Sequence, residues 1–241
     1  MQFFINYIQS MIFEQLFDDK SSTYTYIVSS GKGREALIID PVIEKTENYI
    51  NLLNKLDLKL VKVIDTHIHA DHITAMNELN KRTSCIKIMG EKSKSEVIDL
   101  KIKDDEIIKI ENIELRSIYT PGHTDCSYSY LMNDRVFTGD TLLINGTGRT
   151  DFQNGSSYDA YESLFNKLLK LPEKTLVYPA HDYNGKKYST IENEKNNNPR
   201  LQVGSKEEYA EIMNNLNLAN PKMMDIAVPA NVKGLTLDQI N

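Results

Sequence analysis

One short stretch of the chain concentrates side chains that bind metals. It reads His67-Ile68-His69-Ala70-Asp71-His72, so three imidazoles and one carboxylate fall within six residues. An apolar run at residues 60–64, with the pattern of a strand, comes just before it. Imidazole nitrogens and carboxylate oxygens are ligands for zinc, iron and related metals. The stretch therefore predicts a metal site at the end of a strand.

The other histidines and one further aspartate fit the same site. His123 follows a Pro-Gly turn, Asp140 follows an apolar run at 135–138, and His181 follows another at 175–178. All 5 histidines of the chain thus stand where a loop would present them. Isolated histidines usually make local hydrogen bonds, but a set placed in this way is typical of a metal centre. In α/β proteins, reactive groups collect on the loops at strand ends.

The elements that must position these residues alternate in type. Short β-branched runs predict strands at 36–39, 60–64, 86–89, 128–132, 135–138 and 175–178, and one or two more within 107–119. Apolar residues at helical spacing predict helices near 50–56, at 73–81 and at 159–171. A capping box that begins at Ser205 predicts a last helix that ends near Asn215.

Taken together, these positions resemble the signature of the metallo-β-lactamase superfamily. The resemblance implies an α/β fold, a four-layer αββα sandwich in a single domain, with the metal at one edge of its two sheets. We expect the domain to cover residues 12–241 and residues 1–11 to be an N-terminal extension, with Met11 as an alternative start. The signature leaves the reaction open, because hydrolases, oxidoreductases and nucleases share it.

Three further segments resemble those of persulfide dioxygenases, also called sulfur dioxygenases. They are Gly148-Arg149-Thr150-Asp151-Phe152-Gln153, Tyr178-Pro179-Ala180-His181-Asp182-Tyr183 and Asn198-Pro199-Arg200-Leu201. The resemblance implies one catalytic iron(II) per chain, held by His67, His123 and Asp140. Independently, two imidazoles and one carboxylate form the triad of non-haem iron enzymes, which leaves positions open for substrate and O2.

The same resemblance implies roles for the remaining polar residues. His69, Asp71, His72 and His181 would surround the iron and orient its ligands through hydrogen bonds, or hold a second metal. The implied reaction, part of sulfide metabolism, oxidises glutathione persulfide with O2 and water to sulfite and glutathione. Because glutathione carries two carboxylates, Arg149 and Tyr183 are the predicted substrate-binding residues, with Arg200 as a further candidate.

Two other classes of protein remain open. A glyoxalase II-like thioesterase would hydrolyse an acyl-glutathione with two zinc ions. Its ligands would be His67, His69 and His123 for one ion, Asp71, His72 and His181 for the other, and Asp140 between them. The Gly-Arg-Thr-Asp-Phe-Gln segment and the short carboxy-terminal region favour the dioxygenase. A non-catalytic metal-binding module would have lost a ligand, and none is missing here.

Composition indicates which classes of partner and which cellular compartment to expect. The formal net charge of −6 offers no basic excess for nucleic acid, and no apolar run reaches the roughly 18 residues of a membrane span. Cys85 and Cys126 are too few for a disulfide framework, and we expect both to pack in the core. The start lacks the positive leader that an exported β-lactamase would need. We expect a cytoplasmic enzyme, with mitochondria as the alternative in a eukaryote, that forms a homo-oligomer, by resemblance a dimer.

Overall fold

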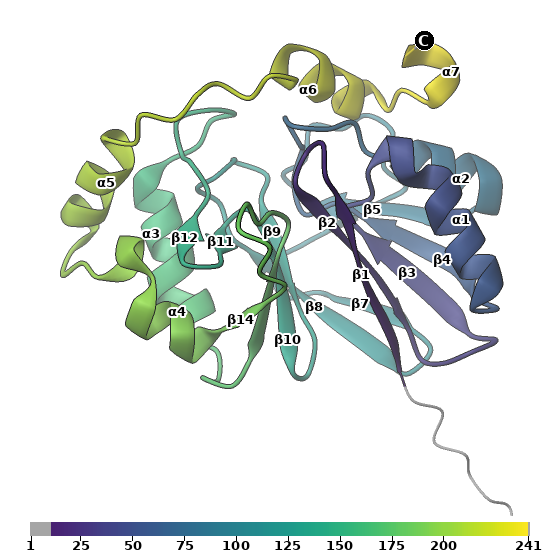
Figure 1. Cartoon of the computed structure of the whole chain (residues 1–241), viewed down its shortest axis with the longest axis horizontal. Helices are drawn as coiled ribbons and strands as arrows, with labels where there is room; N and C mark the ends of the chain where they lie inside the picture. Colours follow the sequence, from purple (N-terminus) through teal and green to yellow (C-terminus); the bar gives the residue numbers. More distant parts are fainter. Residues whose placement is uncertain (1–10, 241) are drawn as a thin grey trace, which may run out of the picture.

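The computed structural model describes residues 11–240 and arranges them around two six-stranded sheets (Figure 1). The first sheet has the order β1 (Ile12–Asp18), β2 (Thr23–Ser29), β3 (Glu35–Ile39), β4 (Lys59–Ile64), β5 (Ile86–Gly90) and β6 (Leu100–Ile102). Strands β1 to β3 are antiparallel, whereas β3 to β6 run parallel. The predicted extension at residues 1–11 lies outside the described residues except for Met11, so a boundary there stays a prediction.

The second sheet is mostly antiparallel. Its order is β14 (Ser189–Thr190), β13 (Leu176–Pro179), β10 (Arg135–Gly139), β9 (Tyr128–Leu131), β8 (Ile113–Tyr119) and β7 (Ile107–Ile110). Only β10 and β13 pair in parallel. A separate two-stranded ribbon, β11 (Leu142–Leu143) and β12 (Gly146–Thr147), follows directly after β10.

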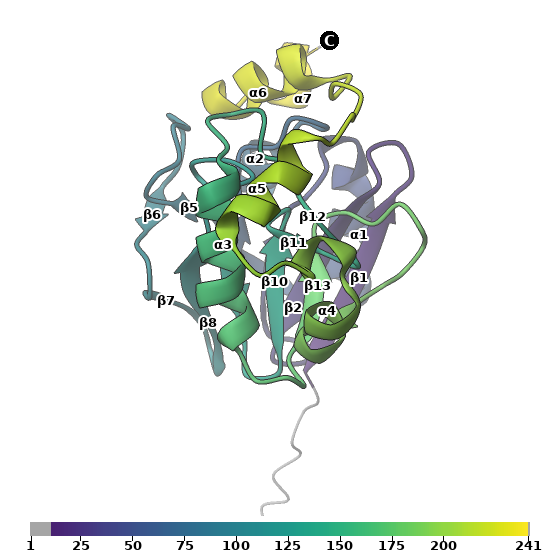
Figure 2. The ribbon, with the colours of Figure 1, turned by 90° about the vertical axis from the view of Figure 1, so that its left-hand side faces the viewer.

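Helices cover the outer faces of both sheets. Helices α1 (Thr46–Lys55) and α2 (Met76–Thr83) pack on the first sheet, and α6 (Met224–Lys233) joins their apolar cluster through Ala227 and Ala230. Helices α3 (Ser157–Asn166), α4 (Ile191–Asn197) and α5 (Lys206–Asn214) cover the second sheet (Figure 2). Short 3-10 turns, η1 (Ile43–Lys45), η2 (Leu168–Lys170) and η3 (Pro199–Leu201), and a final helix α7 (Leu237–Ile240) complete the elements. Within residues 11–240, no helix has the length and apolar character that a membrane crossing requires.

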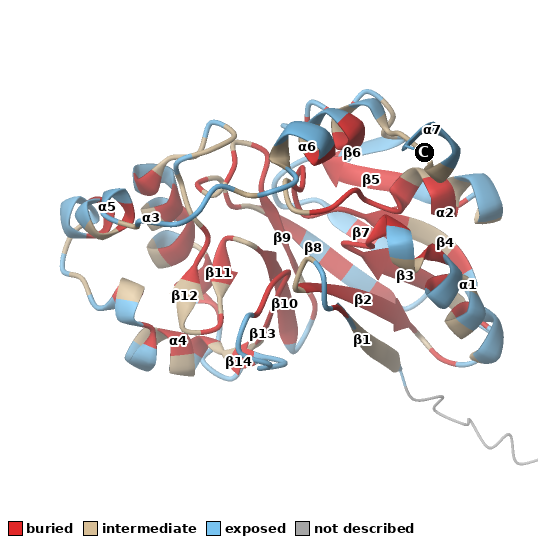
Figure 3. Cartoon of the chain, turned by 45° about the horizontal axis from the view of Figure 1, so that its top comes forward, coloured by how far each residue is buried: buried red, intermediate tan, exposed pale blue. Residues whose placement is uncertain are grey.

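The core between the sheets is apolar and aromatic. Tyr26, Ile39 and Ile64 of the first sheet meet Tyr130 and Phe137 of the second, and all five are almost fully buried. Figure 3 shows the strands β2, β3 and β10 mostly in the colour of buried residues. Burial of such large side chains is the main stabilising contribution to a fold of this kind. With helices outside both sheets, the order of layers is αββα, which confirms the predicted fold.

The predicted strands are present, but the helices differ at their ends. The helix expected at 73–81 begins only at Met76, because Thr74 pairs with Val42 in a β-bridge. The helix expected at 159–171 ends at Asn166 and continues as the 3-10 turn η2. Ser205 does cap α5, but the prediction that this helix is the last was wrong. Helix α6 follows it and contains Pro229. Proline is unfavourable inside helices, so the sequence pattern does not predict a helix here.

The parallel strands bring the predicted site residues to one edge of the sandwich. Asp40 directly follows β3, and the stretch that begins at Asp65 follows β4. In the second sheet Asp140 follows β10 and His181 follows β13. A β-bridge between Thr23 and His181 and a hydrogen bond from the Tyr24 N–H to the Ala180 carbonyl (2.7 Å) join the two sheets at this edge.

Candidate metal centre

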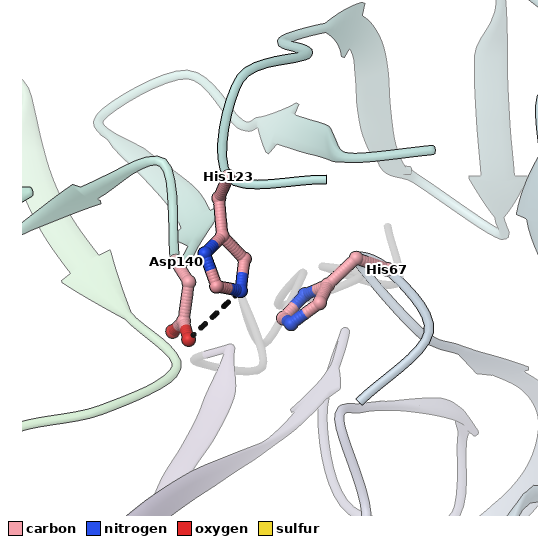
Figure 4. Close-up of side chains that lie close together, drawn as sticks. All are labelled: His67, His123 and Asp140. Carbon is pink, nitrogen blue, oxygen red and sulfur yellow. Dashed lines mark ion pairs between the residues drawn. The ribbon is translucent and has the colours of Figure 1, made fainter. Parts of the chain in front are cut away.

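Three of the predicted ligands converge at this edge from three separate loops. His67 follows β4, His123 lies between β8 and β9, and Asp140 follows β10 (Figure 4). Their metal-binding atoms all lie within 4.8 Å of one another. His123 Nε2 is 3.5 Å from Asp140 Oδ2. The arrangement offers two imidazoles and one carboxylate to a single ion.

Hydrogen bonds fix the tautomer of both histidines. His123 Nδ1 lies 2.8 Å from the Arg149 carbonyl oxygen, so it donates its proton there and leaves a lone pair on Nε2. His67 Nδ1 lies 3.0 Å from Thr66 Oγ1. Because Thr66 donates its own hydroxyl proton to Asp40 Oδ2 (3.0 Å), its oxygen accepts from His67 Nδ1. Each ring therefore presents an unprotonated Nε2, as metal binding requires.

Asp40 is a functional residue that the sequence patterns did not reveal. It is 1% exposed, and its Oδ1 accepts the Thr66 N–H at 2.7 Å and lies 3.1 Å from His69 Nε2. Its φ of 51° is a left-handed value that aspartate tolerates better than most residues. The only signal in the sequence was its place between a strand and Pro41. Asp40 thus orients two residues of the site without being among the predicted ligands.

The protonation states of the converging group suit a metal. Burial, reinforced by His69, lowers the pKa of His67 well below its usual value, so the imidazole is neutral. Burial alone would raise the pKa of Asp140, but the nearby His181, His123 and His67 lower it below its usual value. A neutral imidazole beside an ionised carboxylate is the form in which these groups bind a cation.

The other four predicted residues lie beside this group, and Asp71 joins two of them. Asp71 Oδ2 is 2.9 Å from both His72 Nδ1 and His181 Nε2, and 3.1 Å from Thr23 Oγ1, a contact not predicted. His181 Nδ1 lies 2.7 Å from Asp140 Oδ1, so its ring is held between two carboxylates. Burial would lower the pKa of His181, but Asp140 and Asp71 raise it well above its usual value.

Two nitrogens of this second group have no hydrogen-bond partner within residues 11–240. They are His69 Nδ1 and His72 Nε2, and both are buried. Buried polar atoms without a partner are rare in proteins and indicate a missing water or ion. His69, Asp71 and His72 also bring one ligand atom each within 4.8 Å of the others. The residues present therefore fit one metal at the first group and leave a second position chemically open.

A cavity of about 480 Å³ adjoins the first group and contains the predicted substrate residues. His123 and Asp140 form part of its wall, together with Arg149, Tyr183 and Arg200. Tyr183 is 71% exposed, and its ring lies parallel to the His181 imidazole with centroids 6.1 Å apart. A ligand in this cavity would contact both the converging group and these three side chains.

The two arginines of the cavity differ in their pairing. Arg149 donates from Nε and Nη2 to the two Asp151 oxygens (2.7 and 2.8 Å) and from Nη1 to the Ala219 carbonyl (2.7 Å). Three of its five N–H groups are thus used, and two remain for a ligand. Arg200 donates to the Thr147 carbonyl and forms no ion pair with any residue from 11 to 240.

Both cysteines lie in the apolar cluster of the first sheet. Cys85 and Cys126 are free and buried. Burial raises the pKa of each thiol, which makes the reactive thiolate less available. Their position supports the predicted packing role.

Comparison with known proteins agrees with this geometry. The sequence pattern of the Metallo-beta-lactamase superfamily matches residues 18–99 and 89–181. The mitochondrial persulfide dioxygenase ETHE1 of Mus musculus is 42% identical over 92% of this chain and 88% of its own length. The crystal structure of ETHE1 from Myxococcus xanthus superposes with a TM-score of 0.90 at 47% identity, over 92% of this chain and 98% of that one.

A hydrolase is also similar, at a lower level. The hydroxyacylglutathione hydrolase of Dictyostelium discoideum is 33% identical over 72% of this chain and 68% of its own length. Identity and coverage are both higher for the two ETHE1 proteins. This chain therefore belongs to the metallo-beta-lactamase superfamily and, within it, to the family of the persulfide dioxygenases.

Proposed function

We propose that the protein is an iron(II)-dependent dioxygenase that oxidises glutathione persulfide with O2 and water to sulfite and glutathione. One iron per chain would be held by His67, His123 and Asp140, and it would supply the electron-transfer chemistry that O2 requires. The observation that carries the proposal is the convergence of these three ligand atoms within 4.8 Å beside a cavity. The names and high identity of the relatives support the substrate class.

The chain's own residues would bind and orient the reactants. The Arg149 carbonyl and the Asp40–Thr66 pair hold the two imidazoles in one tautomer, so the centre is arranged before substrate arrives. Apolar side chains such as Ile144 and Leu218 line the cavity and would exclude water around the persulfide. The two carboxylates of glutathione would meet the free N–H groups of Arg149 and Arg200.

A single metal is favoured by the bonding of the second group. Asp71 and His181 are already paired with each other, and His181 separates Asp71 from Asp140. A second ion would have to replace these contacts. The glyoxalase II-like thioesterase with two zinc ions remains the alternative, because all its ligands are present and His69 Nδ1 and His72 Nε2 are unpaired.

One experiment separates the two functions. Protein purified without air would be analysed for metal content and then for O2 consumption with glutathione persulfide. We expect about one iron per chain, O2 uptake that depends on the persulfide, and sulfite as product. Two metals per chain, no O2 uptake and hydrolysis of an acyl-glutathione would instead establish the thioesterase.

Replacing Arg149 by alanine is expected to weaken substrate binding while the metal stays bound. The KM for glutathione persulfide should rise about tenfold, since a hydrogen bond to a charged group contributes about 1.5–3 kcal/mol. Metal content should not change, because His123 bonds to the backbone carbonyl of Arg149 and the side chain is not involved.

The matched control is Arg116→Ala, which removes an arginine from an exposed ion pair with Asp105 (2.9 Å) outside the cavity. Steady-state kinetics and metal analysis of both variants are the measurement. An unchanged KM in Arg149→Ala would leave Arg149 only the role of bracing its loop through Asp151 and Ala219.

We also propose the homodimer and the single catalytic domain that the family resemblance implies. Light scattering should give about twice the 27.6 kDa of one chain. A mass of one chain would contradict the dimer without affecting the metal centre.

A further inference from the structure

A buried asparagine on helix α6 contacts the loop that carries four of the predicted site residues. We call residues 67–74 the histidine loop. Asn231 is 6% exposed, and its Oδ1 accepts the Thr74 N–H at 2.9 Å. Its Nδ2 donates to the His69 carbonyl at 2.9 Å and to the His72 carbonyl at 3.0 Å.

These three bonds use both donors of the side chain and its carbonyl oxygen. A primary amide has two N–H donors and a carbonyl, and all of them face the backbone of the histidine loop. The bonded groups belong to His69, His72 and Thr74, so the clamp spans most of the loop. Thr74 also donates from Oγ1 to Asp65 Oδ1 (3.0 Å), which ties the end of the loop to the residue after β4, close to its start.

Asn231 is itself held rigidly. Its neighbours Ala227 and Ala230 are buried in the apolar cluster that α6 shares with α1 and α2. Its backbone carbonyl accepts from Ser95 Oγ (3.3 Å), and the Val232 carbonyl accepts the Glu96 N–H (3.0 Å). Figure 1 shows α6 lying across the edge of the sandwich where the histidine loop runs. The Asn231 amide therefore holds the backbone of the histidine loop at a fixed position relative to helix α6.

We propose that Asn231 is a positioning residue of the metal centre, so that metal affinity depends on the three bonds between its side chain and the histidine loop. The inference rests on the proposed metal centre. His67 lies two residues before His69, whose carbonyl is the first to bond to Asn231. The backbone of His69 and His72 determines where the imidazoles of these two residues point. Groups that orient metal ligands typically change metal affinity by about 10- to 100-fold when they are removed.

The sharpest test is Asn231→Asp, which keeps the shape of the side chain and removes both donors. A carboxylate oxygen would then take the place of Nδ2 next to the His69 and His72 carbonyl oxygens, which repel it. Cobalt(II) titration of metal-free protein, followed by visible absorption, measures the dissociation constant. We expect cobalt to bind at least about tenfold more weakly than in the unchanged protein.

Two control variants separate positioning from general stability. Asn214→Asp makes the same chemical change at an exposed position of α5 and should leave cobalt affinity within about twofold. Ala230→Gly weakens α6 beside Asn231 but keeps the Asn231 amide, so it should lower the Tm of the metal-free protein but not the cobalt affinity. Equal losses of cobalt affinity in Ala230→Gly and Asn231→Asp would overturn the proposal.

A measurement on the unchanged protein covers the case in which Asn231→Asp does not fold. Hydrogen exchange should find the Thr74 amide as strongly protected as the amides of β4, because its partner is the buried Asn231 side chain. Exchange as fast as that of an exposed loop amide would refute the clamp. The cobalt titration also distinguishes failure of the inference from failure of the proposed function. If the unchanged protein binds no cobalt, the metal centre itself is refuted. If the unchanged protein binds cobalt and Asn231→Asp binds it equally well, only the role of Asn231 is refuted.

Discussion

His123→Ala is expected to lose the metal and the oxidation of persulfide together. The substitution removes one of three converging ligands. Neither neighbour in the chain can replace the imidazole, because Gly122 has no side chain and the buried Thr124 hydroxyl is hydrogen-bonded to Ser127. A catalytic metal stabilises the transition state by several kcal/mol, and every ~1.4 kcal/mol corresponds to a factor of ten in the rate. We therefore expect activity to fall by roughly three orders of magnitude.

Metal analysis and O2 uptake on the same preparation measure both losses. The matched control is Asp125→Ala, in the same loop, which removes a surface ion pair with Lys94 (3.0 Å) and an exposed hydrogen bond from Asn154 (2.8 Å) and should change little. Thermal unfolding of the metal-free forms would show that both variants fold. If His123→Ala kept one metal per chain and normal turnover, His123 would not be a ligand.

Gly148→Ala should produce the second largest effect, although the residue has no side chain to contribute. A Cβ at this position would lie 2.1 Å from the Asp140 carbonyl oxygen and 2.9 Å from His123 Nδ1. Both distances are too short, so the segments that carry two of the three ligands must move apart. We expect metal affinity to fall at least about tenfold and stability to fall by about 1–3 kcal/mol, the usual cost of overpacking.

Gly146→Ala is a closely matched control, because it makes the same change two residues away. Its added Cβ would meet nothing closer than Leu143 Cβ at 3.9 Å, an ordinary contact. Metal titration and urea unfolding of both variants should separate them clearly. Equal behaviour of the two alanine variants would show that the close packing of Gly148 against His123 is unimportant.

The Gly148 contact explains why a glycine opens the Gly-Arg-Thr-Asp segment. The next carbonyl along the chain, that of Arg149, is the acceptor for His123 Nδ1. A close approach of this backbone to the His123 ring is possible only where no side chain intervenes. A segment that is predicted to bind substrate is therefore also in contact with two of the predicted metal ligands, His123 and Asp140.

The sequence by itself determined which metal-binding side chains meet at the site. His67, His123, Asp140 and His181 each follow a strand or turn, and parallel strands bring such positions to one edge of a fold. Local patterns also predicted the strands, because a strand that buries one or both faces shows an alternating or continuous run of apolar, β-branched residues within a short stretch of sequence. They could not reveal α6, in which Pro229 contradicts the local helical preference and packing of Ala227 and Ala230 outweighs it.

Only the tertiary structure decided how those residues are held. Asp40 bonds to Thr66 26 residues away, Thr23 lies beside Asp71 at a separation of 48, and Asn231 meets Thr74 at a separation of 157. Contacts over such distances leave no periodic pattern, since each depends on where two unrelated segments meet in the folded chain. Hydrogen bonds also act over about 3 Å, so the pairing of Arg149 with Asp151 and Ala219 is defined only after the backbone is in place. The chemistry of the site is local in sequence, whereas its orientation is a property of the whole fold.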